Sequence, residues 1–140
     1  MLRQARRLAL RALELQGTVR MEDVGVPRAR VPELLVAIER IAAAHGVRCA
    51  TFGHAGDGNL HPNLIFDRDD PDAAPLTDLV RDEIFRAALA LGGTVTAEHG
   101  IGSARREWLP IQRGEGAVAA MRAIKAALDP LGILNPGRVL

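Results

Sequence analysis

The chain has 140 residues and a formal net charge of +1, with 48% hydrophobic and 25% charged residues. This length fits one domain that can bury a core without disulfides or a structural metal. The near-neutral charge and the 3% aromatic content argue against nucleic acid and anionic membranes as partners. Cys49 is the only cysteine, so no disulfide can form within the chain, and we expect a reducing, cytoplasmic location.

The N-terminal segment, residues 2–16, is Arg-rich and has the spacing of an amphipathic helix that ends at Gly17. An organellar transit peptide shares this Arg-rich, acid-poor composition, but we favour an ordinary helix with a solvated face. No apolar run in the chain approaches the roughly 20 residues that a membrane-spanning helix needs, so we expect no membrane span.

Hydrophobic periodicity, glycine and proline predict the elements that follow. Apolar residues at helical spacing alternate with Val- and Thr-rich runs that suit strands. Pro62 lies inside one such run. Because proline donates no ladder hydrogen bond, we expect its nitrogen to point away from a neighbouring strand or to lie at a bulge. We predict strands at 18–26, 47–52, 59–66 and 94–100, and helices at 27–46, 76–91, 103–109 and 115–128.

Without the two ends, the predicted order is strand, helix, strand, strand, helix, strand, which is the ferredoxin-like unit. We therefore predict an α+β fold with a ferredoxin-like βαββαβ antiparallel sheet, helices on one face and extra C-terminal helices. The other face of the sheet is then open. Leu60, Leu64 and Phe66 suit the face beneath the helices, which leaves His61 and Asn63 on the open face because side chains alternate along a strand.

Glu98 is predicted to share this open face, by the alternation of the fourth strand. The third and fourth strands usually flank the first in this fold, so the backbones of His61 and Glu98 would lie roughly 10 Å apart. Two side chains of this size can converge on one ion across that gap. His54, in the turn at the same end of the sheet, can fold over as a third ligand. The alternation of the first strand is ambiguous and contributes nothing to this prediction.

Two imidazoles and one carboxylate are a common ligand set for a divalent metal, with positions left open for substrate. The alternative is a hairpin that merely carries imidazoles, because the spacing matches no helical zinc motif such as H-E-x-x-H. Glycines around these residues allow the close approach of a ligand or simply make tight turns: Gly53, Gly56, Gly58, Gly100 and Gly102.

Three stretches carry a resemblance to a known family: "FGHAGDGNLHPNLIF" (52–66), "GGTVTAEHGIGSARR" (92–106) and "IKAALDPLGILNPGRVL" (124–140). A fourth, "EDVGVPRARVPELL" (22–35), agrees with them. Together they resemble the C-terminal domain of the FAD-linked oxidases, which include D-lactate dehydrogenases, the flavin subunit of glycolate oxidase and D-2-hydroxyglutarate dehydrogenase. The resemblance covers residues 18–140, so we divide the chain into an N-terminal helix or linker (1–17) and this domain.

The resemblance implies a ferredoxin-like fold and the oxidation of a 2-hydroxy acid to a 2-oxo acid, with FAD held mainly by a separate N-terminal domain. In members with a metal, two histidines and a glutamate hold the ion, and zinc, manganese and iron all accept such ligands. The residues at the matching positions here are metal ligands His54, His61 and Glu98, general base His99, substrate contact Asn63, and Asn135, Pro136 and Gly137 near the flavin.

Two departures from the family pattern matter. The chain has Arg105-Arg106 where the family often has Lys-Arg, and an arginine fork does not replace an ammonium in every role. The chain also has no FAD-binding domain, so we expect it to be inactive alone and to need an FAD-binding domain or subunit as its partner. Ile65 shares the predicted open face, and such an apolar residue without a cover favours a homodimer.

Two other functions stay open on the sequence. The chain can be a free-standing module that binds a metal or small molecule without redox activity. It can also be an oligomerisation domain, because ferredoxin-like sheets pair through open faces. Metal analysis separates these two, and bound flavin distinguishes both from the oxidase domain.

Overall fold

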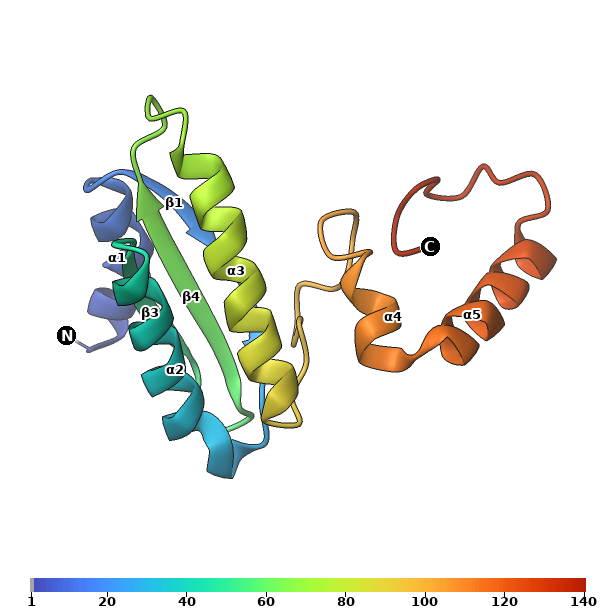
Figure 1. Cartoon of the computed structure of the whole chain (residues 1–140), viewed down its shortest axis with the longest axis horizontal. Coiled ribbons are helices and arrows are strands. Elements are labelled where there is room, and N and C mark those ends of the chain that lie inside the picture. Colours follow the sequence, from blue (N-terminus) through green and yellow to red (C-terminus); the bar gives the residue numbers. More distant parts are fainter. Residues whose placement is uncertain (1) are drawn as a thin grey trace.

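The computed structural model describes residues 2–140, with side chains from residue 8 onward. The chain has an α+β fold in which helices lie on both sides of an antiparallel sheet, and a helical arm extends from one side (Figure 1). The elements are α1 (Leu2–Glu14), β1 (Thr18–Met21), β2 (Val24–Gly25), the short 3-10 helix η1 (Arg28–Arg30), α2 (Val31–Ala44), β3 (Arg48–His54), β4 (Asn59–Phe66), α3 (Ala73–Ala90), α4 (Trp108–Arg113) and α5 (Glu115–Leu128).

Strand β4 is the centre of the sheet and pairs antiparallel with all three other strands. β3 lies on one side of it, in a register that runs from Arg48 opposite Ile65 to His54 opposite Asn59. β1 and β2 lie end to end on the other side and together form the predicted first strand. This order agrees with the ferredoxin-like prediction.

The predicted fourth strand at 94–100 is wrong beyond its first residue. Within the described part of the chain, this segment contributes only one bridge, from Thr94 to Gly25. The cause is the carboxylate of Asp23, whose Oδ2 accepts the backbone N–H groups of the three consecutive residues 97–99 at 2.9–3.0 Å. A segment that turns its N–H groups toward one carboxylate cannot direct them alternately toward a neighbouring strand.

Pro62 explains why the first strand is divided in two. Its carbonyl accepts a hydrogen bond from the N–H of Glu22 at 2.8 Å, but it has no N–H to return to that strand. Its nitrogen therefore faces the neighbouring strand, contrary to prediction, and the ladder is interrupted between Met21 and Val24. The register is continuous across the gap, so no bulge forms there.

The hydrophobic core lies between the sheet and the pair α2 and α3, as the alternation of β4 predicts. Leu60 and Leu64 are buried in this core, whereas Phe66 is half-buried. Ile65, on the opposite face, is only 6% exposed, so the prediction of an uncovered apolar residue there is wrong. The chain turns from α1 into β1 over this position, and a Cβ added at Gly17 would lie 3.2 Å from Ile65 Cγ2.

Helices α4 and α5 form the arm on the right of Figure 1, and the C-terminal tail follows α5. The helix predicted at 103–109 begins only at Trp108, and Pro110 lies in its first turn, where proline is tolerated. The Trp108 ring contacts the Phe85 ring edge-on at 5.3 Å and so ties the arm to α3. The arm and tail carry large apolar side chains that are more than half exposed: Ile111, Ile124, Leu128, Leu131, Ile133 and Leu134.

Across the described residues, none of the helices combines the length and apolar character required to span a bilayer.

Candidate metal centre

The hairpin of β3 and β4 places two histidines on one face of the sheet. His54 is the last residue of β3 rather than part of the turn, which spans residues 55–58. Phe52 lies opposite His61, and His54 lies opposite Asn59. Directly opposed residues in an antiparallel pair point to the same side, so the two imidazoles are diagonal neighbours on the face away from α2 and α3. Their ring centroids are 5.6 Å apart and their planes are nearly perpendicular.

Glu98 reaches both imidazoles from the segment that follows the bridge at Thr94. Its Oε1 lies 3.1 Å from His61 Nε2 and 3.8 Å from His54 Nε2. One ligand atom from each of the three residues lies within 4.8 Å of the other two, which is close enough for a single cation to contact all three. The structure therefore brings together the three side chains predicted as metal ligands.

His99 adds a third imidazole to this cluster. Its ring stacks on that of His61, with centroids 5.1 Å apart and planes inclined by 18°, and its Nε2 lies 3.6 Å from Glu98 Oε1. The His99 side chain is 40% exposed, whereas that of His61 is 6% exposed. His61 thus forms the floor of the cluster and His99 its solvent-facing side.

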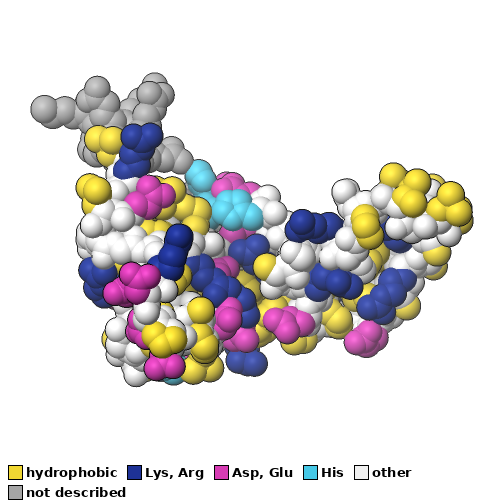
Figure 2. Space-filling view, turned by 90° about the horizontal axis from the view of Figure 1, so that it is seen from above, with side chains coloured by type: hydrophobic (Ala, Val, Ile, Leu, Met, Phe, Trp, Pro, Cys, Tyr) yellow, Lys and Arg dark blue, Asp and Glu magenta, His cyan; other side chains and the backbone are white. Residues whose placement is uncertain are grey.

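These side chains line a pocket of about 400 Å³. The other lining residues come from α1, β1 and β3: Ala9, Met21, Phe52 and Gly53. Helix α1 thus forms part of the wall on the face that was predicted to be open. In Figure 2, histidine side chains (cyan) lie beside acidic side chains (magenta) on the surface between the sheet and the arm. The pocket combines a polar floor with partly apolar walls, a common composition for small-molecule sites.

Asp23 is a residue of this cluster that the sequence did not identify. It is fully buried, and its Oδ2 accepts a hydrogen bond from Thr96 Oγ1 at 2.6 Å in addition to the three backbone N–H groups. Burial alone would raise the pKa of the Asp23 carboxyl, but these hydrogen bonds outweigh it and hold the pKa below its ordinary value. Asp23 Oδ1 lies 4.0 Å from His61 Nδ1.

Two charged residues explain why the alternation of the first strand was unreadable. Val24 is part of the core, which places Arg20 and Glu22 on the same side beneath the helices. Glu22 is 4% exposed and pairs with Arg20 Nε at 2.8 Å and Arg105 Nη2 at 2.9 Å. Because charges stand at core-facing positions, the hydrophobic pattern did not reveal that Asp23 faces the histidines.

Arg105, the arginine that departs from the family pattern, contacts three parts of the fold. Its guanidinium pairs with Glu22 and lies 5.6 Å from the centroid of the Phe85 ring. It also donates a hydrogen bond to the carbonyl of Gly100 at 3.3 Å. Arg105 therefore links the segment after Glu98 to the buried side of the sheet.

The remaining predicted site residues lie outside the pocket. Asn63 is on the histidine face but fully buried, and its Nδ2 donates to the carbonyls of His61 at 2.7 Å and Ala50 at 3.0 Å. The segment Asn135–Gly137 is exposed in the C-terminal tail, with Asn135 at a positive φ of 46°. The structure does not bring this segment to the histidines.

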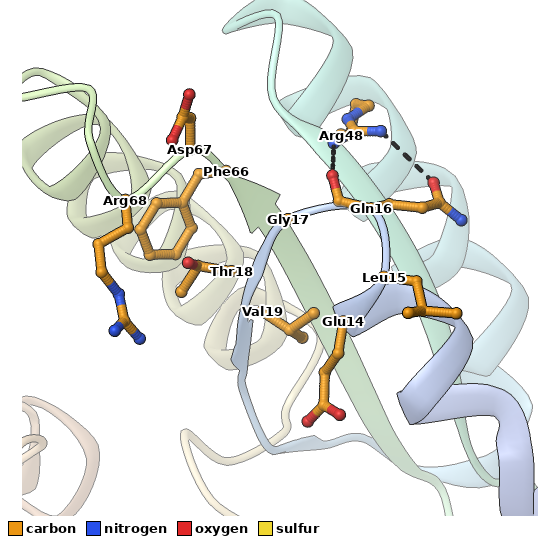
Figure 3. A pocket seen from close by; sticks show the side chains of 10 residues that line it. All are labelled: Glu14, Leu15, Gln16, Gly17, Thr18, Val19, Arg48, Phe66, Asp67 and Arg68. Carbon is orange, nitrogen blue, oxygen red and sulfur yellow. Dashed lines mark hydrogen bonds between the residues drawn. The ribbon is translucent and has the colours of Figure 1, made fainter.

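A larger pocket, of about 850 Å³, contains none of the predicted site residues. It lies among the end of α1, the start of β1 and the end of β4 (Figure 3). Arg48 spans part of it and donates to the carbonyl of Gln16 at 2.7 Å and to its side-chain oxygen at 3.4 Å (Figure 3). Size alone therefore does not identify the candidate site, and the convergence of ligand atoms does.

Comparison with known proteins relates this geometry to a family. The family described as FAD linked oxidases, C-terminal domain, matches residues 1–139. The chain is 44% identical over 139 residues to the glycolate oxidase subunit GlcD of Bacillus subtilis, covering 99% of this chain and 30% of that protein. It is 37% identical over 118 residues to a probable mitochondrial D-lactate dehydrogenase of Danio rerio, covering 84% of this chain and 24% of that protein.

A solved structure supports the fold. The 4-ethylphenol oxidase from Gulosibacter chungangensis, in its isoeugenol complex, superimposes with a TM-score of 0.57 over 86% of this chain and 24% of that chain. The sequence identity is 22%, so this likeness concerns the fold alone. The chain thus spans less than a third of the length of each of these three proteins.

Proposed function

Because the chain belongs to the FAD linked oxidases, as their C-terminal domain, we propose that it is the substrate- and metal-binding part of an FAD-dependent oxidoreductase. The reaction is the oxidation of a 2-hydroxy acid, such as glycolate or D-lactate, to a 2-oxo acid. The observation that carries the proposal is the convergence of His54, His61 and Glu98, whose ligand atoms lie within 4.8 Å of one another.

The ligand set suits a divalent cation. Two imidazole nitrogens and one carboxylate oxygen are accepted by zinc, manganese and iron, and a three-ligand set leaves coordination positions open for a substrate. His54 and Glu98 are 37% and 49% exposed, so the cluster is accessible from the pocket. A divalent ion held there supplies positive charge that favours loss of the proton from the substrate hydroxyl group.

The residues of this chain then orient the substrate and move its proton. His99 stacks beside the ligand cluster and is partly exposed, so its imidazole is placed to accept the hydroxyl proton. Bound FAD would supply the redox chemistry, as the acceptor of the hydride from C2. Asn63 is fully buried outside the pocket and its Nδ2 is occupied by backbone carbonyls, so a substrate contact would require exposure of its buried Oδ1. The segment Asn135–Gly137 keeps its proposed position near the flavin.

The FAD-binding part is the partner that we propose for the helical arm. Large apolar side chains on α5 and the tail, including Ile124 and Leu128, are more than half exposed, which favours burial against another protein surface. Self-association through the arm is the competing outcome and would give the homodimer. A cytoplasmic location also remains a proposal, supported by the single Cys49.

A chimera tests the proposed reaction. This chain replaces the matching segment of the Bacillus subtilis glycolate oxidase subunit, and oxidation of glycolate and D-lactate is followed with an artificial electron acceptor. We expect a yellow protein with activity toward at least one acid. A chimera that binds FAD and metal but oxidises neither acid contradicts the proposal. If the chimera does not fold, titration of the isolated chain with Zn²⁺ or Mn²⁺ still tests the metal site.

Within an active chimera, His99→Ala tests the general base. We expect kcat to fall by about 10²–10⁴-fold with the metal still bound, which is the usual contribution of a positioned acid–base group. The control is His45→Ala. His45 lies outside the pocket, and its Nε2 is 2.9 Å from Glu83 Oε1. Full turnover by His99→Ala would exclude the proposed role of this imidazole.

A further inference from the structure

We infer that Asp23 is the positioning residue of the candidate metal centre. Its two carboxylate oxygens perform different tasks. Oδ2 fixes the backbone that carries Glu98 and His99, and Oδ1 holds His61 in the tautomer with its proton on Nδ1. The inference rests on the proposed function only where a bound metal is concerned, since both contacts belong to the chain itself.

The first task follows from the hydrogen bonds of Oδ2. This oxygen accepts the N–H groups of Ala97, Glu98 and His99 at 2.9–3.0 Å. A charged acceptor strengthens each of these bonds, and the complete burial of Asp23 reduces their screening by solvent. The backbone of the two predicted functional residues is therefore fastened to the first strand, beside the histidine hairpin.

The second task follows from two buried atoms that have no hydrogen-bond partner among the described residues. They are Asp23 Oδ1 and His61 Nδ1, and they lie 4.0 Å apart. With the His61 proton on Nδ1, a donor faces the carboxylate. With the proton on Nε2 alone, two lone pairs would face each other at atoms that bulk solvent does not reach, which is unfavourable. The distance exceeds a hydrogen bond, so we expect it to shorten when His61 Nε2 binds an ion.

The resulting arrangement is a carboxylate, a histidine and a metal in series. A histidine that binds metal through one nitrogen commonly donates its other N–H to a carboxylate, which fixes the ring and increases its basicity. Glu98 competes for the His61 proton in the metal-free chain, because its Oε1 lies 3.1 Å from Nε2. The Nδ1 tautomer leaves the Nε2 lone pair facing this oxygen. Glu98 is half exposed, so solvent screens that contact, whereas the buried Asp23 has no such screening.

A second arrangement of the same atoms is the main competitor. Asp23, His61 and His99 also present ligand atoms within 4.8 Å of one another. An ion in that position would be bound by His61 Nδ1 rather than Nε2, and Asp23 would be a ligand. The nitrogen that carries the His61 proton distinguishes the two arrangements.

The test uses ¹⁵N NMR of the histidine rings in the full chain, without metal and then with Zn²⁺. We expect the His61 proton on Nδ1 in both states. In Asp23→Asn, the side-chain NH₂ can face His61 while the amide oxygen still accepts from the loop, so the metal-free ring should move its proton to Nε2. We also expect the Zn²⁺ affinity of this variant to fall by about 10–100-fold, the usual cost of losing such a partner. Asp69→Asn, an exposed carboxylate between β4 and α3, is the control.

Each outcome decides a separate question. A wild-type His61 proton on Nε2, coordination of Zn²⁺ through Nδ1, or unchanged affinity in Asp23→Asn would overturn the inference. A wild-type chain that binds no metal would contradict the metal site of the proposed function, and the metal-free tautomer would still decide the role of Asp23. If Asp23→Asn does not fold, the wild-type spectrum alone still decides the tautomer.

Discussion

Glu98 Oε1 lies 3.1 Å from His61 Nε2, and this contact joins two segments that are far apart along the chain. The same oxygen lies 3.8 Å from His54 Nε2 and 3.6 Å from His99 Nε2. One carboxylate oxygen therefore faces three imidazole rings. It is the anionic ligand of the proposed set when an ion is bound.

Glu98→Gln should weaken divalent-ion binding. The amide keeps the size of the side chain but removes the negative charge that the cation requires, so we expect the affinity for Zn²⁺ to fall by at least about 10-fold. Competition with a chromophoric chelator measures this change. Glu115→Gln, at the start of α5, is the control and should bind as the wild type does. Equal affinities in the two variants would show that Glu98 is not a ligand.

Gly53→Ala should destabilise the hairpin that carries both histidines. An added Cβ would collide with the carbonyl oxygen of Asn59 and lie 2.8 Å from Leu60 Cα, and both are backbone atoms of β4. Overpacking of this kind costs about 1–3 kcal/mol. Gly56→Ala is the matched control in the turn, because no heavy atom lies within 4 Å of its added Cβ. Urea unfolding of both variants measures the difference, and equal stabilities would refute the predicted collision.

Arg105→Ala should lower the free energy of unfolding by about 3 kcal/mol, because it breaks a buried ion pair and leaves one carboxylate undercompensated. Breaking a buried ion pair usually costs about 3–5 kcal/mol. We expect the low end of this range, because Glu22 keeps its second partner, Arg20. Arg105→Lys should lose less, because the charge remains while the fork and the contact with the Phe85 ring are lost.

The control for Arg105 is Arg40→Ala, at an exposed position on α2. Denaturant unfolding of the three variants gives the comparison. If Arg105→Ala were no less stable than Arg40→Ala, the buried pair with Glu22 would not contribute to the fold.

Acid should release the C-terminal tail through Asp129. Its carboxylate binds the Lys125 ammonium and accepts the N–H groups of Ile133 and Leu134 at 3.0 Å. The ion pair with Lys125 is the largest cause that holds the pKa of Asp129 below its ordinary value, and the backbone hydrogen bonds add to it against the opposing effect of burial. The stabilisation is therefore complete above the ordinary value, about pH 4, and is lost as the pH falls through the lower native pKa.

Amide exchange at Ile133 and Leu134 measures this release as a function of pH. Asp129→Asn should expose both amides at neutral pH and remove the dependence on acid. The same acid transition in this variant would assign the effect to another group.

The alternation of β4 was sufficient to predict its two faces from the sequence, because apolar and polar residues there follow the strand period without exception between Asn59 and Leu64. The faces of the first strand could not be predicted. Arg20 and Glu22 stand at core-facing positions, and the charge that neutralises Glu22 comes partly from the distant Arg105. The alternation of residues that are adjacent in the sequence contains no information about a partner so far along the chain.

The sequence predicted the ligands of the candidate site but not the residue that positions Glu98. His54, His61 and Glu98 were named from residue types, the strand period and the family resemblance, and the structure brings them together. The predicted reason for the position of Glu98 was wrong, because a buried carboxylate and not a strand determines it. Capture of consecutive backbone N–H groups by one side chain has no periodic signature in a sequence.

The distribution of the three proposed ligands along the chain has a consequence for assembly. His54 and His61 meet as soon as a short local turn closes, whereas Glu98 arrives only after the first strand has inserted between β4 and the residues around Thr94. An ion that needs all three would bind weakly to partly assembled intermediates and tightly to the finished domain. Its uptake would then report completion of folding, and its loss would be an early sign of unfolding at the junction between hairpin and loop.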